Sequence, residues 1–301
     1  MKWAGRAISG AFSGTFSGAI SGAISGAISG ALTGACVVLA VACASSSRDG
    51  FSEDAKDAGS TSFATDALGP AAEPSGEVYG HSDTVLYVVD TGTHAVREIG
   101  AFQGCTHVVD IALDESSTIY ASTGAELFLI ENNSGRCSRI ATGTFPNSLS
   151  FVPAGTLEAG KETLVGYNGG DYIRIDPHSG AVTKVGELGG GLESSGDLVS
   201  VKDGKSFLTV KGPGCADCLV EFDPKTGALV KNWGPLGYAN AYGLAFWGGE
   251  LYAFTEGGEV ILVKLAGDEL EATLLPVPNA PADLAFRGAG STTIAPPGDI
   301  K

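Results

Sequence analysis

Short runs of alternating apolar and polar residues, paired across tight turns, dominate the chain from about residue 80 onward. The clearest is 172–186, Tyr-Ile-Arg-Ile-Asp-Pro-His-Ser-Gly-Ala-Val-Thr-Lys-Val-Gly, whose period of two is typical of β-strands. Pro177 presets φ for the first turn position and Gly180 tolerates a positive φ, so the stretch predicts a β-hairpin. Progressively looser copies of this hairpin occupy 219–233, 127–141, 86–100 and 260–274.

A second repeated element lies between these hairpins: a strand of small residues followed by a more aromatic strand. The small-residue strands start at five positions that recur at intervals of about 40 to 50 residues, namely Asp110, Ser148, Asp197, Gly243 and Asp283. A four-stranded unit with this period is the signature of a β-propeller blade. The chain is therefore predicted to be all-β, with one propeller of five four-stranded blades over 80–298 and a tail at 299–301.

The order of the strands predicts how the ring closes. With the small-residue strand innermost, the domain begins at Thr84 with the two outer strands of a blade and ends near Ala295 with the two inner ones. Joining these halves removes the free sheet edges. We therefore expect a closing blade that is shared between the N- and C-terminal strands.

One stretch carries a resemblance to known repeats. Asp110-Ile-Ala-Leu-Asp-Glu-Ser-Ser-Thr-Ile-Tyr-Ala-Ser resembles the repeat of NHL, YVTN and related propellers, and weaker versions lie at 241–257 and 281–295. The resemblance implies the fold alone, because such propellers host protein binding, sugar binding and enzymes alike.

The first 79 residues have a different character. Lys2 and Arg6, the apolar stretch 35–42 and the following Cys43 resemble a bacterial lipoprotein signal peptide, so 1–43 is predicted to direct export and Cys43 to be lipidated. Glycines at every fourth position over 10–34 leave a retained membrane helix as the alternative. The stretch 44–79, rich in Ser, Ala, Asp and Gly, predicts a disordered tether.

The net charge of the chain limits the kinds of partner that it can bind. The formal net charge is −16, whereas nucleic acids and anionic membrane surfaces require a basic patch. We expect no nucleic-acid partner, and contact with the membrane only through the lipid anchor. The predicted location is the bacterial cell envelope, lipid-anchored or periplasmic.

Three carboxylates form the first candidate site. Asp110, Asp197 and Asp283 occupy one register position in three repeats, at one mouth of the central channel. They could bind Ca²⁺, the one cofactor that these residues suggest, or act as the acid and base of a glycosidase-like enzyme. The alternative is that each carboxylate accepts main-chain N–H bonds at the start of its strand.

Two further residues are placed near that mouth. His107 lies close to Asp110 in sequence, and Tyr242 directly precedes an inner-strand position. An aromatic ring beside carboxylates favours a carbohydrate or protein ligand, with packing between blades as the alternative. We therefore expect a binding or scaffold module with no assigned catalytic residue. The alternative is a hydrolase or lyase that uses the carboxylates.

The cysteines predict one disulfide. Cys215 and Cys218 are close in sequence in an exported β-protein, which favours a local structural bond between them. Cys105 and Cys137 are placed towards opposite faces of the ring, so no disulfide is expected between these two.

Overall fold

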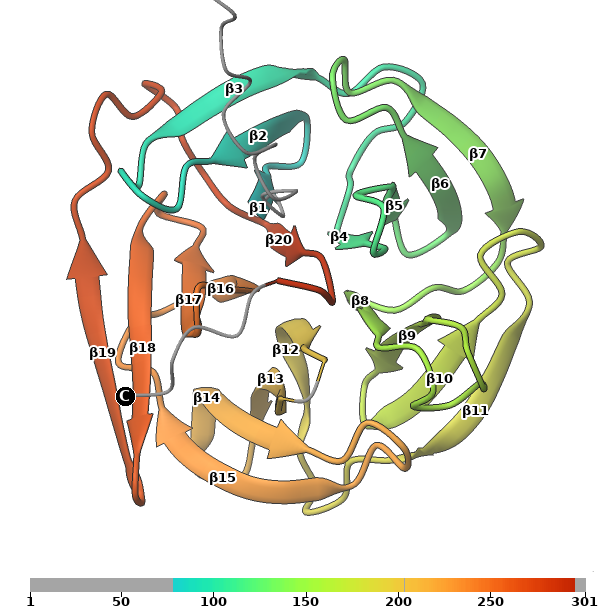
Figure 1. Ribbon diagram of the computed structural model, residues 1–301, viewed down its shortest axis with the longest axis vertical. Helices are drawn as coiled ribbons and strands as arrows, with labels where there is room; N and C mark the ends of the chain where they lie inside the picture. Colours follow the sequence, from blue (N-terminus) through green and yellow to red (C-terminus); the bar gives the residue numbers. More distant parts are fainter. Residues whose placement is uncertain (1–77, 203, 296–301) are drawn as a thin grey trace, which may run out of the picture. The chain divides into compact units, whose positions relative to one another are not determined.

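The structure, a computed structural model, describes residues 78–202 and 204–295. These residues form twenty β-strands and no helix. The strands make five four-stranded antiparallel sheets around a common axis (Figure 1). The predicted five-bladed β-propeller is confirmed.

Four blades are continuous in the chain, and each runs from its innermost strand to its outermost. The first two are β4–β7 (Asp110–Leu113, Ile119–Ser122, Glu126–Ile130, Cys137–Thr142) and β8–β11 (Ser148–Val152, Thr163–Asn168, Asp171–Ile175, Val182–Glu187). The next two are β12–β15 (Glu193–Ser200, Ser206–Gly212, Cys215–Phe222, Leu229–Pro235) and β16–β19 (Ala241–Trp247, Glu250–Thr255, Val260–Ala266, Glu269–Leu275).

The closing blade combines both ends of the described chain, but not in the proportion predicted. Its innermost strand is β20 (Gly288–Ser291), and the other three are β1 (Val78–His81), β2 (Val85–Val89) and β3 (Val96–Ala101). The N-terminal side thus supplies three strands and the C-terminal side one, whereas the sequence predicts two strands from each side. The difference arises because β1, whose four residues are all buried, pairs with β20 in the place expected for 292–295.

The prediction that Asp283 starts the fifth inner strand is wrong. Asp283 is exposed and lies in a turn before β20. The segment instead anchors Phe286, which is fully buried and packs so closely on Gly80 that a Cβ there would lie 2.6 Å from its ring. The register position equivalent to Asp110 belongs to Gly288, which pairs with His81.

The repeated hairpin turn has a common chemistry. The Oδ1 atom of Asp176 accepts the main-chain N–H groups of His178 (2.9 Å) and Ser179 (2.8 Å). Asp90 makes the equivalent bonds in the β2–β3 turn. Gly180 completes the turn with a φ of +70°. The Asp-x-x-x-Gly spacing therefore encodes the turn between the outer strands.

A C-terminal segment crosses one end of the axis. After β20, residues 292–295 turn towards the centre of the ring (Figure 1). The carbonyl of Thr293 accepts the N–H of Lys202 at 3.0 Å, and its hydroxyl donates to Glu162, so the segment contacts two other blades. The end of the axis where the inner strands finish is therefore covered.

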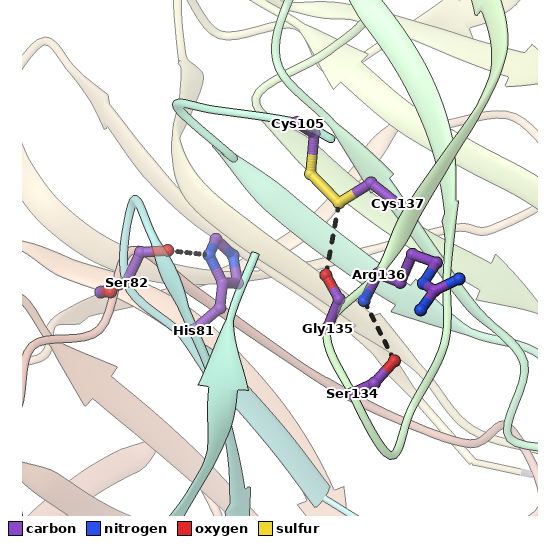
Figure 2. The surroundings of a disulfide bond; sticks show 7 residues. All are labelled: His81, Ser82, Cys105, Ser134, Gly135, Arg136 and Cys137. Carbon is purple, nitrogen blue, oxygen red and sulfur yellow. Dashed lines mark hydrogen bonds between the residues drawn. A yellow bond between two sulfur atoms is a disulfide. The ribbon is translucent and has the colours of Figure 1, made fainter. Parts of the chain in front are cut away.

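Two disulfides are present in the described part of the chain. Cys215 bonds Cys218, as their spacing predicts. Cys105 also bonds Cys137, contrary to the expectation that they lie on opposite faces (Figure 2). The chain between β3 and β4 runs back alongside the hairpin before β7, where Gln103 exchanges main-chain hydrogen bonds with Gly135 and Cys137 at 3.0 and 2.8 Å. Two disulfides indicate an oxidising, extracytoplasmic compartment.

The predicted signal peptide, Cys43, the tether and the tail at 299–301 lie outside the described residues. Within 78–202 and 204–295, no helix is long and apolar enough to cross a membrane.

Candidate functional site

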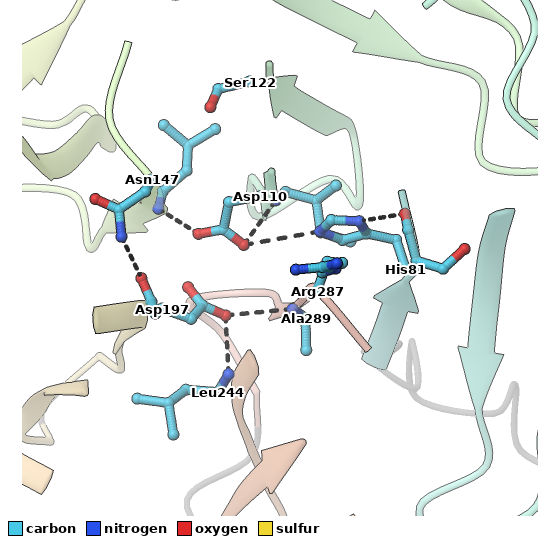
Figure 3. Close-up of polar contacts among 12 residues, drawn as sticks. His81, Asp110, Ser122, Asn147, Asp197, Leu244, Arg287 and Ala289 are labelled. Carbon is cyan, nitrogen blue, oxygen red and sulfur yellow. Dashed lines mark hydrogen bonds and ion pairs between the residues drawn. The ribbon is translucent and has the colours of Figure 1, made fainter. Parts of the chain in front are cut away.

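Two carboxyl groups meet at the axis, where the inner strands begin (Figure 3). Asp110 is the first residue of β4, and Asp197 lies within β12. Both are 0% exposed. The equivalent residues of the other inner strands, Ser148, Gly243 and Gly288, are small or lack a side chain. Asp110 and Asp197 are therefore the two large side chains at this register position.

Asp110 joins two blades. Its Oδ1 accepts the N–H of Ile111, the next residue of its own strand, at 2.9 Å. Its Oδ2 accepts the N–H of Leu149, on the inner strand of the following blade, at 2.6 Å. The carboxyl group thus satisfies a main-chain donor in each of two blades.

Asp197 likewise accepts main-chain N–H groups, from three blades. Its Oδ1 accepts the N–H of Leu198 at 2.6 Å. Its Oδ2 accepts the N–H of Leu244, in the next blade, at 2.8 Å, and that of Ala289, in the closing blade, at 3.3 Å. These bonds give the carboxyl group a structural role at the axis.

Burial sets the protonation of the pair. It raises the pKa of the Asp110 carboxyl well above its usual range, and the neighbouring charge of Asp197 raises it further. Burial also raises the pKa of Asp197, against the opposing effect of its main-chain N–H donors. Two buried carboxyl groups this close disfavour a second negative charge.

His81 lies beside this pair and is also 0% exposed. Its Nδ1 donates to the carbonyl of Ser82 at 2.9 Å (Figure 2). Its Nε2 lies 4.0 Å from Oδ1 of Asp110 and has no hydrogen-bond partner among the described residues. Burial lowers the pKa of the imidazole to about 4, so the ring is neutral near pH 7.

Above the two carboxyl groups is a cavity of about 160 Å³. One residue from each blade lines it, and each directly precedes an inner-strand register position: Val109, Asn147, Gly196, Tyr242 and Arg287. Asp83, Val108 and Ser195 complete the lining. The cavity is therefore the mouth of the propeller axis, opposite the end covered by 292–295, and we call it the axial pocket.

Arg287 is the cation of the axial pocket. Its Nε lies 3.1 Å from Oδ1 of Asp83, and its Nη2 lies 2.8 Å from Oε1 of Glu256. Its guanidinium carbon lies 5.8 Å from the centre of the Tyr242 ring. The Tyr242 hydroxyl donates to Oδ1 of Asn240 at 3.3 Å. The charged groups and the ring thus hold one another in place.

The structure brings together only some of the residues that the sequence singled out. Asp110 and Asp197 lie beneath the axial pocket and Tyr242 lines it. His107 and Asp283 are exposed and outside its lining. In the described part of the chain, no three His, Cys, Asp or Glu side chains are grouped so that they could hold a metal ion.

Sequence reasoning missed His81, Asp83, Asn147 and Arg287. The signal for two of them was present, since Asn147 and Arg287 each precede an inner-strand register position, as Tyr242 does. Arg287 was overlooked because the fifth strand was placed at Asp283 rather than at Gly288. His81 and Asp83 belong to β1 and the turn after it, which repeat β5 and its turn, but they precede Thr84, where the sequence places the first strand of the ring.

No family model matches the chain, and no curated protein matches it in sequence. Among solved structures, virginiamycin B lyase from Staphylococcus aureus is 14% identical with a TM-score of 0.38, over 70% of this chain and 70% of that one. PQQ-bound aldose sugar dehydrogenase from Streptomyces coelicolor is 15% identical with a TM-score of 0.41, over 72% and 82%. A protein of unknown function from Bacteroides caccae is 12% identical with a TM-score of 0.39, over 70% and 77%. At these scores the likenesses carry no argument about activity.

Proposed function

We propose that this protein is an extracytoplasmic binding module whose ligand docks in the axial pocket. The convergence of the five blades carries the proposal, because each contributes one lining residue at the mouth of the axis. A concave site with a few convergent polar groups is the usual form of a ligand site.

The placement of the carboxyl groups favours binding over catalysis. A general acid or base must lie within hydrogen-bond reach of the substrate. Asp110 and Asp197 are fully buried, and both oxygens of each already accept main-chain N–H groups. This arrangement supports a binding module rather than a hydrolase or lyase that uses this pair.

We further propose that the propeller is tethered to the membrane by a lipid on Cys43. The charged N-terminus, the apolar stretch before the cysteine and the two disulfides support export. Labelling cells with a radioactive fatty acid should mark the chain, and Cys43→Ser should abolish the label. Label retained by that variant would contradict the lipid anchor.

Filling the axial pocket tests the proposed function. Val109 lies at the mouth and is 36% exposed, so Val109→Trp should occlude the pocket without repacking the core. Val230→Trp is the matched control, because Val230 is 58% exposed on the outer strand β15. In a thermal-shift screen of sugars, amines, carboxylates and peptides, a ligand should stabilise the wild type and Val230→Trp but not Val109→Trp. Stabilisation that survives in Val109→Trp would place the site elsewhere.

A further inference from the structure

The charges and hydrogen-bonding groups of the axial pocket indicate the class of ligand, provided that this pocket is the binding site proposed above. We propose that it takes a neutral sugar residue, the terminal unit of an uncharged glycan.

The fixed charges at the pocket are already paired with one another, because Arg287 binds both Asp83 and Glu256, so an ionic ligand of either sign has to lie beside a like charge. Arg287 lines the pocket and would repel a ligand cation. Asp83 and Glu256, which pair with it, would repel a ligand anion, as would any charge on the carboxyl pair beneath. Because two carboxylates already neutralise Arg287, a ligand anion would gain little net attraction from it. An uncharged polar ligand meets neither penalty.

Hydrogen-bonding groups of both kinds surround the space. The guanidinium of Arg287 carries five N–H donors, more than its two ion pairs use. The carboxylate of Asp83 has more acceptor positions than its ion pair occupies. Adjacent hydroxyl groups of a sugar ring each donate and accept, so they suit such planar, two-pronged side chains.

Ser195 provides an independent sign of a missing partner. Its Oγ is buried and makes no hydrogen bond with any described residue, although Ser195 lines the pocket. A buried hydroxyl without a partner costs free energy. The Oγ has almost no accessible surface, so a ligand hydroxyl at this wall would supply that partner once the Ser195 hydroxyl rotates towards the pocket.

Tyr242 and two valines provide the apolar contact that a sugar ring needs. The Tyr242 ring lines the pocket, and its hydroxyl is held by Asn240. Val108 and Val109 lie on another part of the lining. The C–H face of a sugar can pack against such a ring while its edge hydroxyls bond Arg287 and Asp83.

The size of the pocket limits what it can hold. Its volume of about 160 Å³ is below the roughly 300–1,000 Å³ of pockets for drug-sized ligands. The segment 292–295 covers the opposite end of the axis, so no chain can thread through. The pocket therefore suits one terminal ring rather than an internal stretch of a polymer.

Ligands that share one sugar ring but differ in charge test the inference. Isothermal titration of the full chain compares methyl glucoside and neutral gluco-oligosaccharides with glucosamine, which carries an ammonium group, and glucuronate, which carries a carboxylate. Parallel sets built on galactose and on mannose test other orientations of the ring hydroxyls. In at least one set the neutral ligand should bind at least tenfold more tightly than both charged analogues.

Two variants and a control assign that binding to the pocket. Asp83→Asn and Tyr242→Leu should each weaken neutral-sugar binding at least tenfold. Asp268→Asn makes the same chemical change at an exposed turn far from the axis and should leave binding unchanged. Thermal melts establish that each variant is folded.

The outcomes separate the sugar inference from the proposed function. If an amine, a carboxylate or a peptide binds as well as the neutral sugars, and Val109→Trp abolishes that binding, the sugar inference is overturned and the axial site stands. If no probe binds, or if Val109→Trp has no effect on the binding seen, both proposals are overturned.

Discussion

The carboxyl group of Asp110 accepts a hydrogen bond at 2.6 Å from the main-chain N–H of Leu149, in the neighbouring blade. Asp197 likewise accepts a hydrogen bond at 2.8 Å from the main-chain N–H of Leu244, in the blade that follows its own. The two aspartates therefore link the inner strands of neighbouring blades at the axis. The same bonds fix the strand starts that line the axial pocket.

Removing the first of these carboxyl groups should destabilise the ring. Asp110→Ala leaves the buried N–H groups of Ile111 and Leu149 without acceptors, and each such loss costs about 1–3 kcal/mol. We expect urea unfolding to show a loss of at least about 2 kcal/mol. Asp268→Ala, at an exposed turn, is the control and should leave stability nearly unchanged. A loss of less than about 1 kcal/mol for Asp110→Ala would contradict the linking role.

The sequence could predict the blade count because the outer hairpins carry their own turn chemistry. Asp176 with Gly180, and Asp223 with Gly227, encode the same turn by local hydrogen bonds and a positive φ. Such signals do not depend on distant partners. The outer strands can therefore be predicted without knowledge of their position in the ring.

Burial of His81 should make stability depend on pH. Its pKa falls from 6.5 to about 4 on folding, so the native state favours the neutral ring. The stabilising contribution is complete above pH 6.5 and is lost as the pH falls through about 4. At 1.36 kcal/mol per unit, the loss across this window is about 3 kcal/mol.

A variant that cannot take up this proton isolates the effect. His81→Asn keeps a donor for the Ser82 carbonyl but does not titrate. The carboxyl pair acts in the opposite direction, because raised carboxyl pKa values add stability at low pH that is lost as the pH rises. We therefore compare the unfolding free energies of the two proteins at each pH. The wild type should lose its advantage between pH 6.5 and 4, and a difference that stays constant would refute a buried neutral imidazole.

Two turn glycines should differ in their tolerance of a methyl group. Gly227 has a φ of +73°, and a Cβ there would overlap the Tyr172 side chain of the preceding blade. Gly267 has a φ of +60° but nothing within 4 Å of such a Cβ. Gly267→Ala should cost about 1–2 kcal/mol through the backbone alone. Gly227→Ala should cost about 1–3 kcal/mol more through the overlap, as measured by thermal unfolding. Equal costs would mean that the blades do not approach closely there.

The two disulfides should contribute unequally. Cys105–Cys137 closes a separation of 32 residues and Cys215–Cys218 one of 3. Chain entropy gives about 3–4 kcal/mol for the first and about 1–2 kcal/mol for the second. Replacing each pair by serines and measuring urea unfolding tests this order. A larger loss from the Cys215–Cys218 pair would show that chain entropy does not govern their effects.

The sequence could not predict how the ring closes or what meets at its axis. The closing strand β20 is Gly-Ala-Gly-Ser, which carries no alternation of apolar and polar residues. The neighbouring Asp-Leu-Ala-Phe at 283–286 imitates the inner-strand pattern, although Phe286 fills a space beside Gly80. Arg287 reaches the axial pocket only because β20 pairs with β1, a contact between the two ends of the described chain.

Mapping the amide groups that respond to a ligand tests the central claim most directly. Two-dimensional ¹H–¹⁵N spectra of the full chain are recorded with and without the neutral methyl glycosides at millimolar concentration. We expect the largest shifts at the five residues that precede the inner-strand register positions: Val109, Asn147, Gly196, Tyr242 and Arg287. The outer turns at Gly180 and Gly227 should not shift. Shifts concentrated on the outer strands, or no shift at the axial pocket, would contradict the account.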